Sequence, residues 1–78
     1  MPKLKESPAD KARRTLNGNI GFYIYYNNLD EETLLKAVKL SPSTFQRRRK
    51  DVGNFTVNEL IRLAAAFNVP IGALFEQR

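Results

Sequence analysis

Residues 40–50 read Leu40-Ser41-Pro42-Ser43-Thr44-Phe45-Gln46-Arg47-Arg48-Arg49-Lys50 and combine a helix start signal with four consecutive cations. Ser41 is expected to cap the helix by accepting a hydrogen bond from the backbone N–H of Ser43 or Thr44. Pro42 suits the first helical position because its φ is preset. Leu40 and Phe45 have the spacing of a hydrophobic staple. The pattern therefore predicts a helix over residues 41–50 with a defined start.

A helical wheel divides this segment into an inner and an outer face. Phe45 and Val52 face inward, with Arg48 and Arg49 on the flanks. The outer face holds hydrogen-bond donors, namely Ser43, Gln46, Arg47 and Lys50. Such a face donates many hydrogen bonds and accepts few, which suits phosphate oxygens and the guanine edge in a DNA major groove. The alternative is a solvated cationic face that binds nothing.

The formal charge of +5 is concentrated in two places. Residues 1–14 carry five cations against two acids, and residues 41–50 carry four cations and no acid. Such clusters suit a polyanion, for which nucleic acid is the default and an anionic membrane surface is the competitor. The longest apolar run, residues 20–26, is too short to span a bilayer, and residues 1–14 do not resemble a secretory signal. We therefore expect a cytoplasmic protein.

The composition argues against an enzyme. Among 78 residues there is no cysteine and no histidine, so disulfides, thiol chemistry and the common transition-metal sites are excluded. The only acid cluster, residues 30–32, is explained by helix initiation, and no glycine-rich phosphate loop accompanies it. We expect no cofactor, no metal and no small-molecule substrate. One domain is expected over residues 7–78, after a flexible basic arm of residues 1–6.

The first helix is predicted to start near Pro8, with Ser7 as its N-cap and Asp10 at the third helical position. Leu16 and Ile20, followed by Tyr23 or Ile24, have helical spacing for one buried face. Two glycines interrupt this pattern, each costing roughly 1 kcal/mol relative to alanine in a helix interior; they are Gly18 and Gly21. Because residues 20–26 also have strong β character, an edge strand or hairpin is the alternative there.

The next helix is expected over residues 29–38, with Asp30 as N-cap, acids in the first turn, and Leu29 stapled to Leu34. A short break at residues 39–40 precedes the basic helix. After Lys50, residues 51–54 have the composition of a turn. Gly53 and Asn54 both tolerate positive φ in such a turn.

Thr56 and Glu59 form a T-x-x-E capping box, with Phe55 and Leu60 as its staple. A helix through Phe67 is expected, ended by Asn68. Its predicted apolar stripe consists of Leu60, Ile61, Leu63, Ala64 and Phe67. Pro70 is then expected to start a short helix containing Ile71, Leu74 and Phe75.

This arrangement resembles the lambda-repressor-like (Xre, phage Cro and repressor type) helix-turn-helix family over roughly residues 16–75. The resemblance rests on the short helix Leu29-Asp30-Glu31-Glu32-Thr33-Leu34-Leu35-Lys36-Ala37-Val38, the basic helix, the stripe Leu60-Ile61-Arg62-Leu63-Ala64 and the tail Asn68-Val69-Pro70-Ile71-Gly72-Ala73-Leu74-Phe75. It implies an all-α, compact domain of four to five helices, in which residues 41–50 are the recognition helix. Five positions depart from the family. It usually has glutamine, alanine and glycine where this chain has Glu31, Leu35 and Lys39. Lys39 must therefore adopt the left-handed conformation or reshape the turn. The family also tends to have an aliphatic residue in place of Arg48 and often an acid in place of Arg49.

The resemblance implies sequence-specific binding of double-stranded DNA by a transcriptional regulator of phage or mobile-element repressor type, acting as a homodimer. The family's base-contacting positions carry over to Pro42, Ser43, Gln46 and Arg47, of which proline offers no side-chain hydrogen bond. Phosphate contacts are expected from Lys39, Ser41, Thr44, Arg48, Arg49 and Lys50. In the arm, Lys3 and Lys5 are candidates for following a groove, with simple disorder as the alternative. The candidate dimer contacts are Ile71, Leu74 and Phe75, and the alternative is that the same residues close the core.

The aromatic residues of the first helix support a different class of function. Phe22, Tyr23, Tyr25 and Tyr26 cannot all face one small core, so part of the surface must be aromatic. The chain could then be a protein-interaction module, antitoxin-like or an adaptor, that uses residues 20–26. Single-stranded nucleic acid is a weaker alternative, because these aromatics do not interleave with the basic run.

Overall fold

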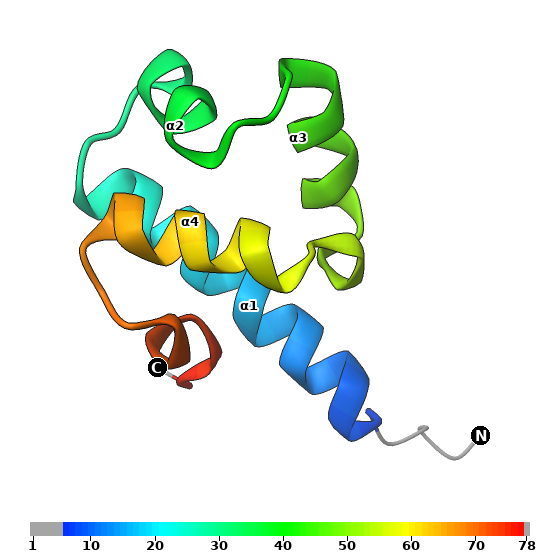
Figure 1. Ribbon diagram of the computed structural model, residues 1–78. Coiled ribbons are helices and arrows are strands. Elements are labelled where there is room, and N and C mark those ends of the chain that lie inside the picture. Colours follow the sequence, from blue (N-terminus) through cyan, green and yellow to red (C-terminus); the bar gives the residue numbers. More distant parts are fainter. Residues whose placement is uncertain (1–5, 78) are drawn as a thin grey trace.

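The computed structural model describes residues 6–77, and this part of the chain contains helices and no strand (Figure 1). The four α-helices and two 3₁₀-helices are α1 (Pro8–Tyr26), α2 (Glu31–Val38), α3 (Pro42–Lys50), η1 (Val52–Asn54), α4 (Val57–Phe67) and η2 (Ile71–Phe75). The expectation of an all-α chain is therefore confirmed. The alternative of a strand over residues 20–26 is wrong, because those residues complete α1.

Helix α1 begins as its sequence predicts, since the Oγ of Ser7 accepts a hydrogen bond of 3.1 Å from the backbone N–H of Asp10. The helix continues through Gly18 and Gly21, neither of which has positive φ. The burial of Leu16 and Ile20 and the stacking of Tyr23 on Phe67, with ring centroids 5.5 Å apart, favour this helix over the local β character.

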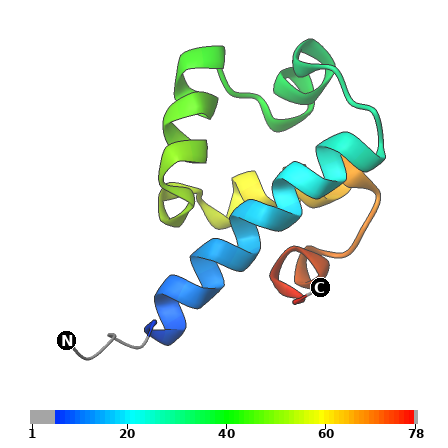
Figure 2. The same ribbon diagram turned by 180° about the vertical axis from the view of Figure 1, so that it is seen from behind.

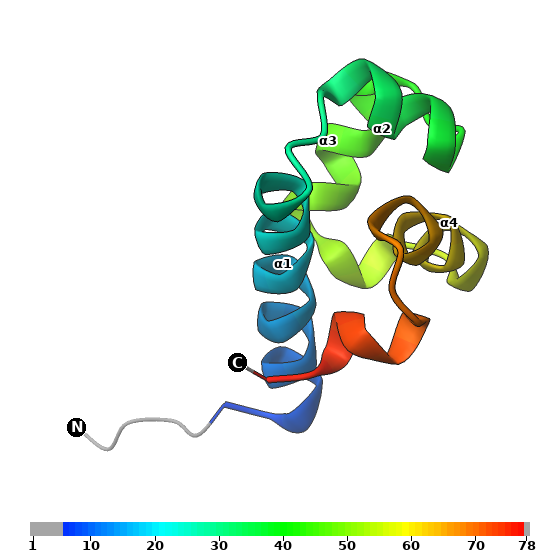
Figure 3. The same cartoon turned by 90° about the vertical axis from the view of Figure 1, so that its left-hand side faces the viewer.

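The core lies where α1 crosses α4, and Figures 1 and 2 show this crossing from opposite sides. Helix α2 packs on one part of α4, and η2 packs against both α1 and α4 (Figure 3). The largest fully buried side chains are Ile20, Leu34, Leu63, Leu74 and Val38. These five residues come from α1, α2, α4 and η2, and Phe45 of α3 belongs to the same core cluster, so the core also holds α3 in place.

Two helix ends use non-glycine residues in the left-handed region. Lys39 ends α2 with φ 60° and ψ 43°, and Asn68 ends α4 with the same angles. The expectation for Lys39 is thus confirmed in its left-handed form, and Asn68 ends its helix as expected. Only residues 39–41 separate α2 from α3, so the two helices are joined by a tight turn.

The start of α4 is fixed by the predicted capping box. The backbone N–H of Glu59 donates to Thr56 Oγ1 over 3.1 Å, and the backbone N–H of Thr56 donates to Glu59 Oε1 over 2.9 Å. Phe55 and Leu60, the predicted staple, are both buried. This local device sets the direction in which the chain leaves η1.

In the second half of the chain, the structure specifies the expected turn and the expected last helix, and it corrects one residue of the α4 stripe. Residues 52–54 form a 3₁₀-helix without positive φ, because Asp51 Oδ1 accepts from the backbone N–H of Gly53 over 3.3 Å and closes the turn. Ile61 is 50% exposed, since the buried stripe of α4 turns away from it. The expected last short helix is a 3₁₀-helix, with Pro70 at its N-cap.

Within residues 6–77 no helix has the length and apolar character needed to cross a membrane.

Candidate nucleic-acid interface

Helix α3 is anchored on its inner side by aromatic packing. Phe45 is 4% exposed and lies edge-on to Phe55, with ring centroids 6.2 Å apart. Val52, the first residue of η1, is also buried. The inner face therefore agrees with the helical wheel, and the opposite side of α3 is left to solvent.

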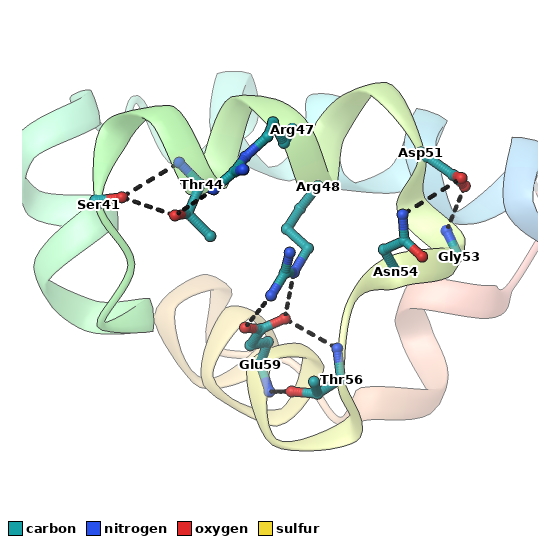
Figure 4. A network of polar contacts seen from close by, with 9 residues as sticks. All are labelled: Ser41, Thr44, Arg47, Arg48, Asp51, Gly53, Asn54, Thr56 and Glu59. Carbon is teal, nitrogen blue, oxygen red and sulfur yellow. Dashed lines mark hydrogen bonds and ion pairs between the residues drawn. The ribbon is translucent and has the colours of Figure 1, made fainter.

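The outer side of α3 carries hydrogen-bond donors and no carboxylate. The exposed residues from its N-cap to its last residue are Ser41, Pro42, Ser43, Gln46, Arg47 and Lys50. Arg47 donates one hydrogen bond of 3.3 Å from Nη2 to Thr44 Oγ1, which holds the guanidinium along its own helix (Figure 4). Since a guanidinium has five N–H donors, Arg47 keeps most of its donors for a ligand. The structure thus brings together the three expected base-contacting residues, Ser43, Gln46 and Arg47.

The two hydroxyls expected to meet phosphates already serve the helix start. Ser41 Oγ accepts from the backbone N–H of Thr44 over 3.2 Å, as predicted for the N-cap. The same hydroxyl donates to Thr44 Oγ1 over 2.8 Å. Ser41 and Thr44 therefore form a closed local pair beneath Arg47.

Arg48 turns away from the outer face and meets α4 (Figure 4). Its Nε lies 3.1 Å from Glu59 Oε1, and its Nη2 lies 3.4 Å from Glu59 Oε2. The side chains of Arg48 and Glu59 are 28% and 9% exposed, so the pair is largely shielded from solvent. A phosphate contact from Arg48, as expected from the sequence, would compete with this ion pair.

The carboxyl of Glu59 has a pKa below its ordinary value. Burial opposes ionisation, but hydrogen bonds from Arg48 and from the backbone N–H of Thr56 outweigh that cost. Glu59 thus has two roles, since it completes the capping box of α4 and also holds α3 through Arg48.

Arg49 and Lys50 lie at the C-terminal end of α3, next to α1. Arg49 is partly buried, and its Nε donates to Asn17 Oδ1 over 3.4 Å. This partial desolvation lowers the pKa of the Arg49 guanidinium. Lys50 is exposed, as is Lys39 at the end of α2.

Other predicted site residues lie apart from α3. Lys3 and Lys5 lie outside the described residues. Among the candidate dimer contacts, Ile71 and Phe75 are exposed, whereas Leu74 is fully buried and belongs to the core. For Leu74 the structure therefore agrees with the alternative that the residue closes the core.

An open depression between α1 and α3 was not predicted from the sequence. It has a volume of about 200 Å³, and we call it the α1–α3 basic groove; its lining residues are Arg13, Arg14, Asn17, Arg49, Lys50, Asp51 and Val52. The positive charge of residues 1–14 was the only sequence feature that indicated an anion-binding site on α1. Its position depends on how α1 packs on the rest of the chain, which no local pattern encodes.

Comparisons with protein-family models, with curated proteins and with solved structures find no match to this chain.

Proposed function

We propose that this chain is a sequence-specific, double-stranded DNA-binding transcriptional regulator of phage or mobile-element repressor type, with a lambda-repressor-like helix-turn-helix formed by α2 and α3. One observation carries the proposal. The outer face of α3 presents Ser43, Gln46 and Arg47 to solvent without an acid, while Phe45 and Arg48 anchor the helix from behind. An α-helix fits the major groove, which is about 12 Å wide, and donors on such a helix can read base edges.

In the proposed complex, Arg47 makes a bidentate contact with a guanine, and Ser43 and Gln46 contact the neighbouring bases. Lys39 and Lys50, both exposed cations, meet phosphates. Helices joined by a turn of three to four residues are typical of helix-turn-helix units, and the α2–α3 turn at residues 39–41 has that length.

Replacing Arg47 tests the reading face. We expect Arg47→Ala to weaken binding to a preferred duplex by about 1 to 3 kcal/mol and to relax preference at one base pair, with little loss on random DNA. Lys50→Ala, the matched loss of one cation, should weaken both duplexes alike and lower the salt slope by about one. Fluorescence anisotropy on a selected and a scrambled duplex at several salt concentrations measures both effects. Equal weakening of the two duplexes by Arg47→Ala would contradict the assignment.

The proposed DNA-bound form is a homodimer, because two half-sites about 34 Å apart supply affinity that a single recognition helix lacks. With Leu74 in the core, the contacts left for such a dimer are Ile71 and Phe75. Sedimentation of the free protein and of its complex would show a dimer on a palindromic site. A monomer bound one-to-one to a single half-site would contradict this part of the proposal.

A second candidate function rests on the C-terminal end of α1. Tyr25 and Tyr26 are 86% and 72% exposed, and Tyr26 stacks on Phe22 with ring centroids 5.6 Å apart. Exposed aromatics of this kind suit a protein-interaction module. Binding to the selected duplex that is unchanged by Tyr25→Ser but weakened by Arg47→Ala would favour DNA over a protein partner as the main target.

A further inference from the structure

The α1–α3 basic groove collects cations from two elements that are far apart in the sequence. Arg13 and Arg14 come from α1, and Arg49 and Lys50 come from the last turn of α3. Arg13 passes over Gly53, where a Cβ would lie only 2.9 Å from its Nε. The groove is thus formed by side chains that the fold holds against one another.

The positive charges that line the groove are not neutralised by its acidic lining residue. Its one acidic residue, Asp51, uses its carboxylate to accept from the backbone N–H of Gly53 and from the side-chain amide of Asn54. Arg13 pairs with Asp10, and Arg14 pairs with Glu6, but both pairs are exposed and so contribute little. Among the lining residues, four cations therefore meet one carboxylate that is already in use, and the two further acids lie in exposed pairs with Arg13 and Arg14.

Arg49 lacks a carboxylate partner among residues 6–77. Its one hydrogen bond goes to the neutral amide oxygen of Asn17, although its side chain is partly withdrawn from water. Partly desolvated guanidinium groups are normally paired with an anion, and their fork of donors matches two phosphate oxygens. The position of Arg49 therefore favours an anionic ligand in the groove.

The spacing of residues along α3 relates the α1–α3 basic groove to the proposed DNA-reading face. Ser43 and Arg49 are six residues apart in α3, which is about 9 Å along the axis at 1.5 Å per residue. If Ser43, Gln46 and Arg47 read bases, the last turn lies at the rim of a groove about 12 Å wide, where the phosphates run. Lys50 both belongs to the outer face and lines the α1–α3 basic groove, so it connects the two surfaces.

We propose that the α1–α3 basic groove holds a backbone phosphate of the bound duplex, outside the base pairs that α3 reads. Arg49 binds the phosphate oxygens, and Arg13 and Arg14 extend the contact along the same strand. This inference rests on the proposed function and extends the interface from α3 onto α1. The groove would then fix the angle of α3 in the major groove.

The test combines protein variants with single neutral methylphosphonates placed along the flanks of a selected duplex. In the wild type, one flanking position should weaken binding roughly ten-fold when neutralised, as expected for a lost charge-assisted hydrogen bond. In Arg49→Gln the same substitution should cause no further loss, and the salt slope should be lower by about one. Arg13→Gln, at an exposed position on α1, provides a second variant whose folding does not depend on partial burial.

The matched control is Lys11→Gln, which removes the same charge from an exposed position of α1 outside the groove. It should keep the full methylphosphonate effect. Equal methylphosphonate effects in wild type, Arg49→Gln and Arg13→Gln would overturn the inference while leaving the proposed function intact. Failure of the wild type to prefer any duplex would overturn both. Inorganic phosphate that shifts the Arg49 resonances, together with unchanged duplex binding by Arg49→Gln, would indicate a site for free anions and would also overturn the inference.

Discussion

Glu59→Ala is expected to lower the free energy of unfolding by about 2 to 4 kcal/mol. The substitution removes the Glu59 half of the capping box, and a single capping device is worth about 0.3 to 1.5 kcal/mol. It also leaves Arg48, a guanidinium only 28% exposed, without its carboxylate. Breaking a buried pair on one side costs about 3 to 5 kcal/mol, and the remaining exposure of Arg48 reduces that cost here.

Urea unfolding followed by circular dichroism measures this effect, and Glu59→Gln is the matched control. Glutamine can still accept from the backbone N–H of Thr56, so it should retain the cap while losing the charge. The loss for Glu59→Gln should therefore lie between wild type and Glu59→Ala. A loss below about 0.5 kcal/mol for Glu59→Ala would place it among ordinary surface substitutions and contradict the role of Glu59.

The same pair predicts a pH dependence with a definite sign. Because the pKa of Glu59 is lowered in the folded state, its contribution is fully present above the pKa of an unfolded glutamate, about 4.3. The contribution is lost as the pH falls through the folded value. The stability difference between wild type and Glu59→Gln should therefore shrink below about pH 4.3, and a constant difference down to pH 2 would contradict the ion pair.

The Arg48–Glu59 ion pair also links the stability of the fold to the proposed recognition of DNA. Arg48 lies next to Arg47 in α3, and its guanidinium fixes the helix to the first turn of α4. Loosening that link lets α3 rotate about its own axis, which moves the outer face relative to a bound duplex. Glu59→Gln should then reduce preference for the selected duplex more than it reduces binding to random DNA.

The helix starts and stops could be predicted because their causes are local. Ser41, Thr56 and Asn68 act on backbone groups within one helical turn, and the structure places each of them at the expected helix end. Short-range hydrogen bonding and sterics are sufficient for such predictions. Lys39 differs, because the resemblance left two alternatives for it, a left-handed residue or a reshaped turn, and the structure has the left-handed one.

The contacts that orient the site could not be predicted in this way. Arg48 and Glu59 are 11 positions apart, and Arg49 and Asn17 are 32 positions apart. Both pairs form only after the helices pack, and many pairings of cations with polar residues are compatible with the same sequence pattern. Ile61 illustrates the same point, because its exposure depends on how α4 is rotated against α1 and α2.

Asn19 was also missed, although it lies beside Ile20 on the buried face of α1. It is 2% exposed, and its Nδ2 donates to the backbone oxygens of Leu74 over 2.9 Å and Glu76 over 2.8 Å, with Ala73 at 3.4 Å. It therefore ties α1 to the chain around the end of η2. An asparagine between apolar residues is easily taken for a break in the stripe, but here it supplies donors to carbonyls that end a helix.

Asn19→Ala is expected to lower the free energy of unfolding by about 2 to 3 kcal/mol, since it removes these donors and leaves buried acceptors unsatisfied. Asn58→Ala, at an exposed position in the first turn of α4, is the matched control and should change stability by less than about 0.5 kcal/mol. Urea unfolding of both variants provides the comparison. Equal stabilities of the two variants would contradict the role of Asn19.

Asn19→Asp provides a second test of whether a hydrogen-bond donor is needed at residue 19. An ionised carboxylate only accepts hydrogen bonds, so it would face the backbone oxygens of Leu74 and Glu76 with no donor to offer. Burial and these oxygens should raise the pKa of the new carboxyl above about 3.9, its ordinary value. The folded state then holds the proton more tightly, so the stability of Asn19→Asp should fall as the pH rises from about 4.

The carboxylic acid at low pH can donate to one carbonyl, and the variant should then approach Asn19→Ala or exceed it in stability. A stability of Asn19→Asp that parallels wild type across this pH range would show that the tie between α1 and η2 does not depend on a donor at residue 19.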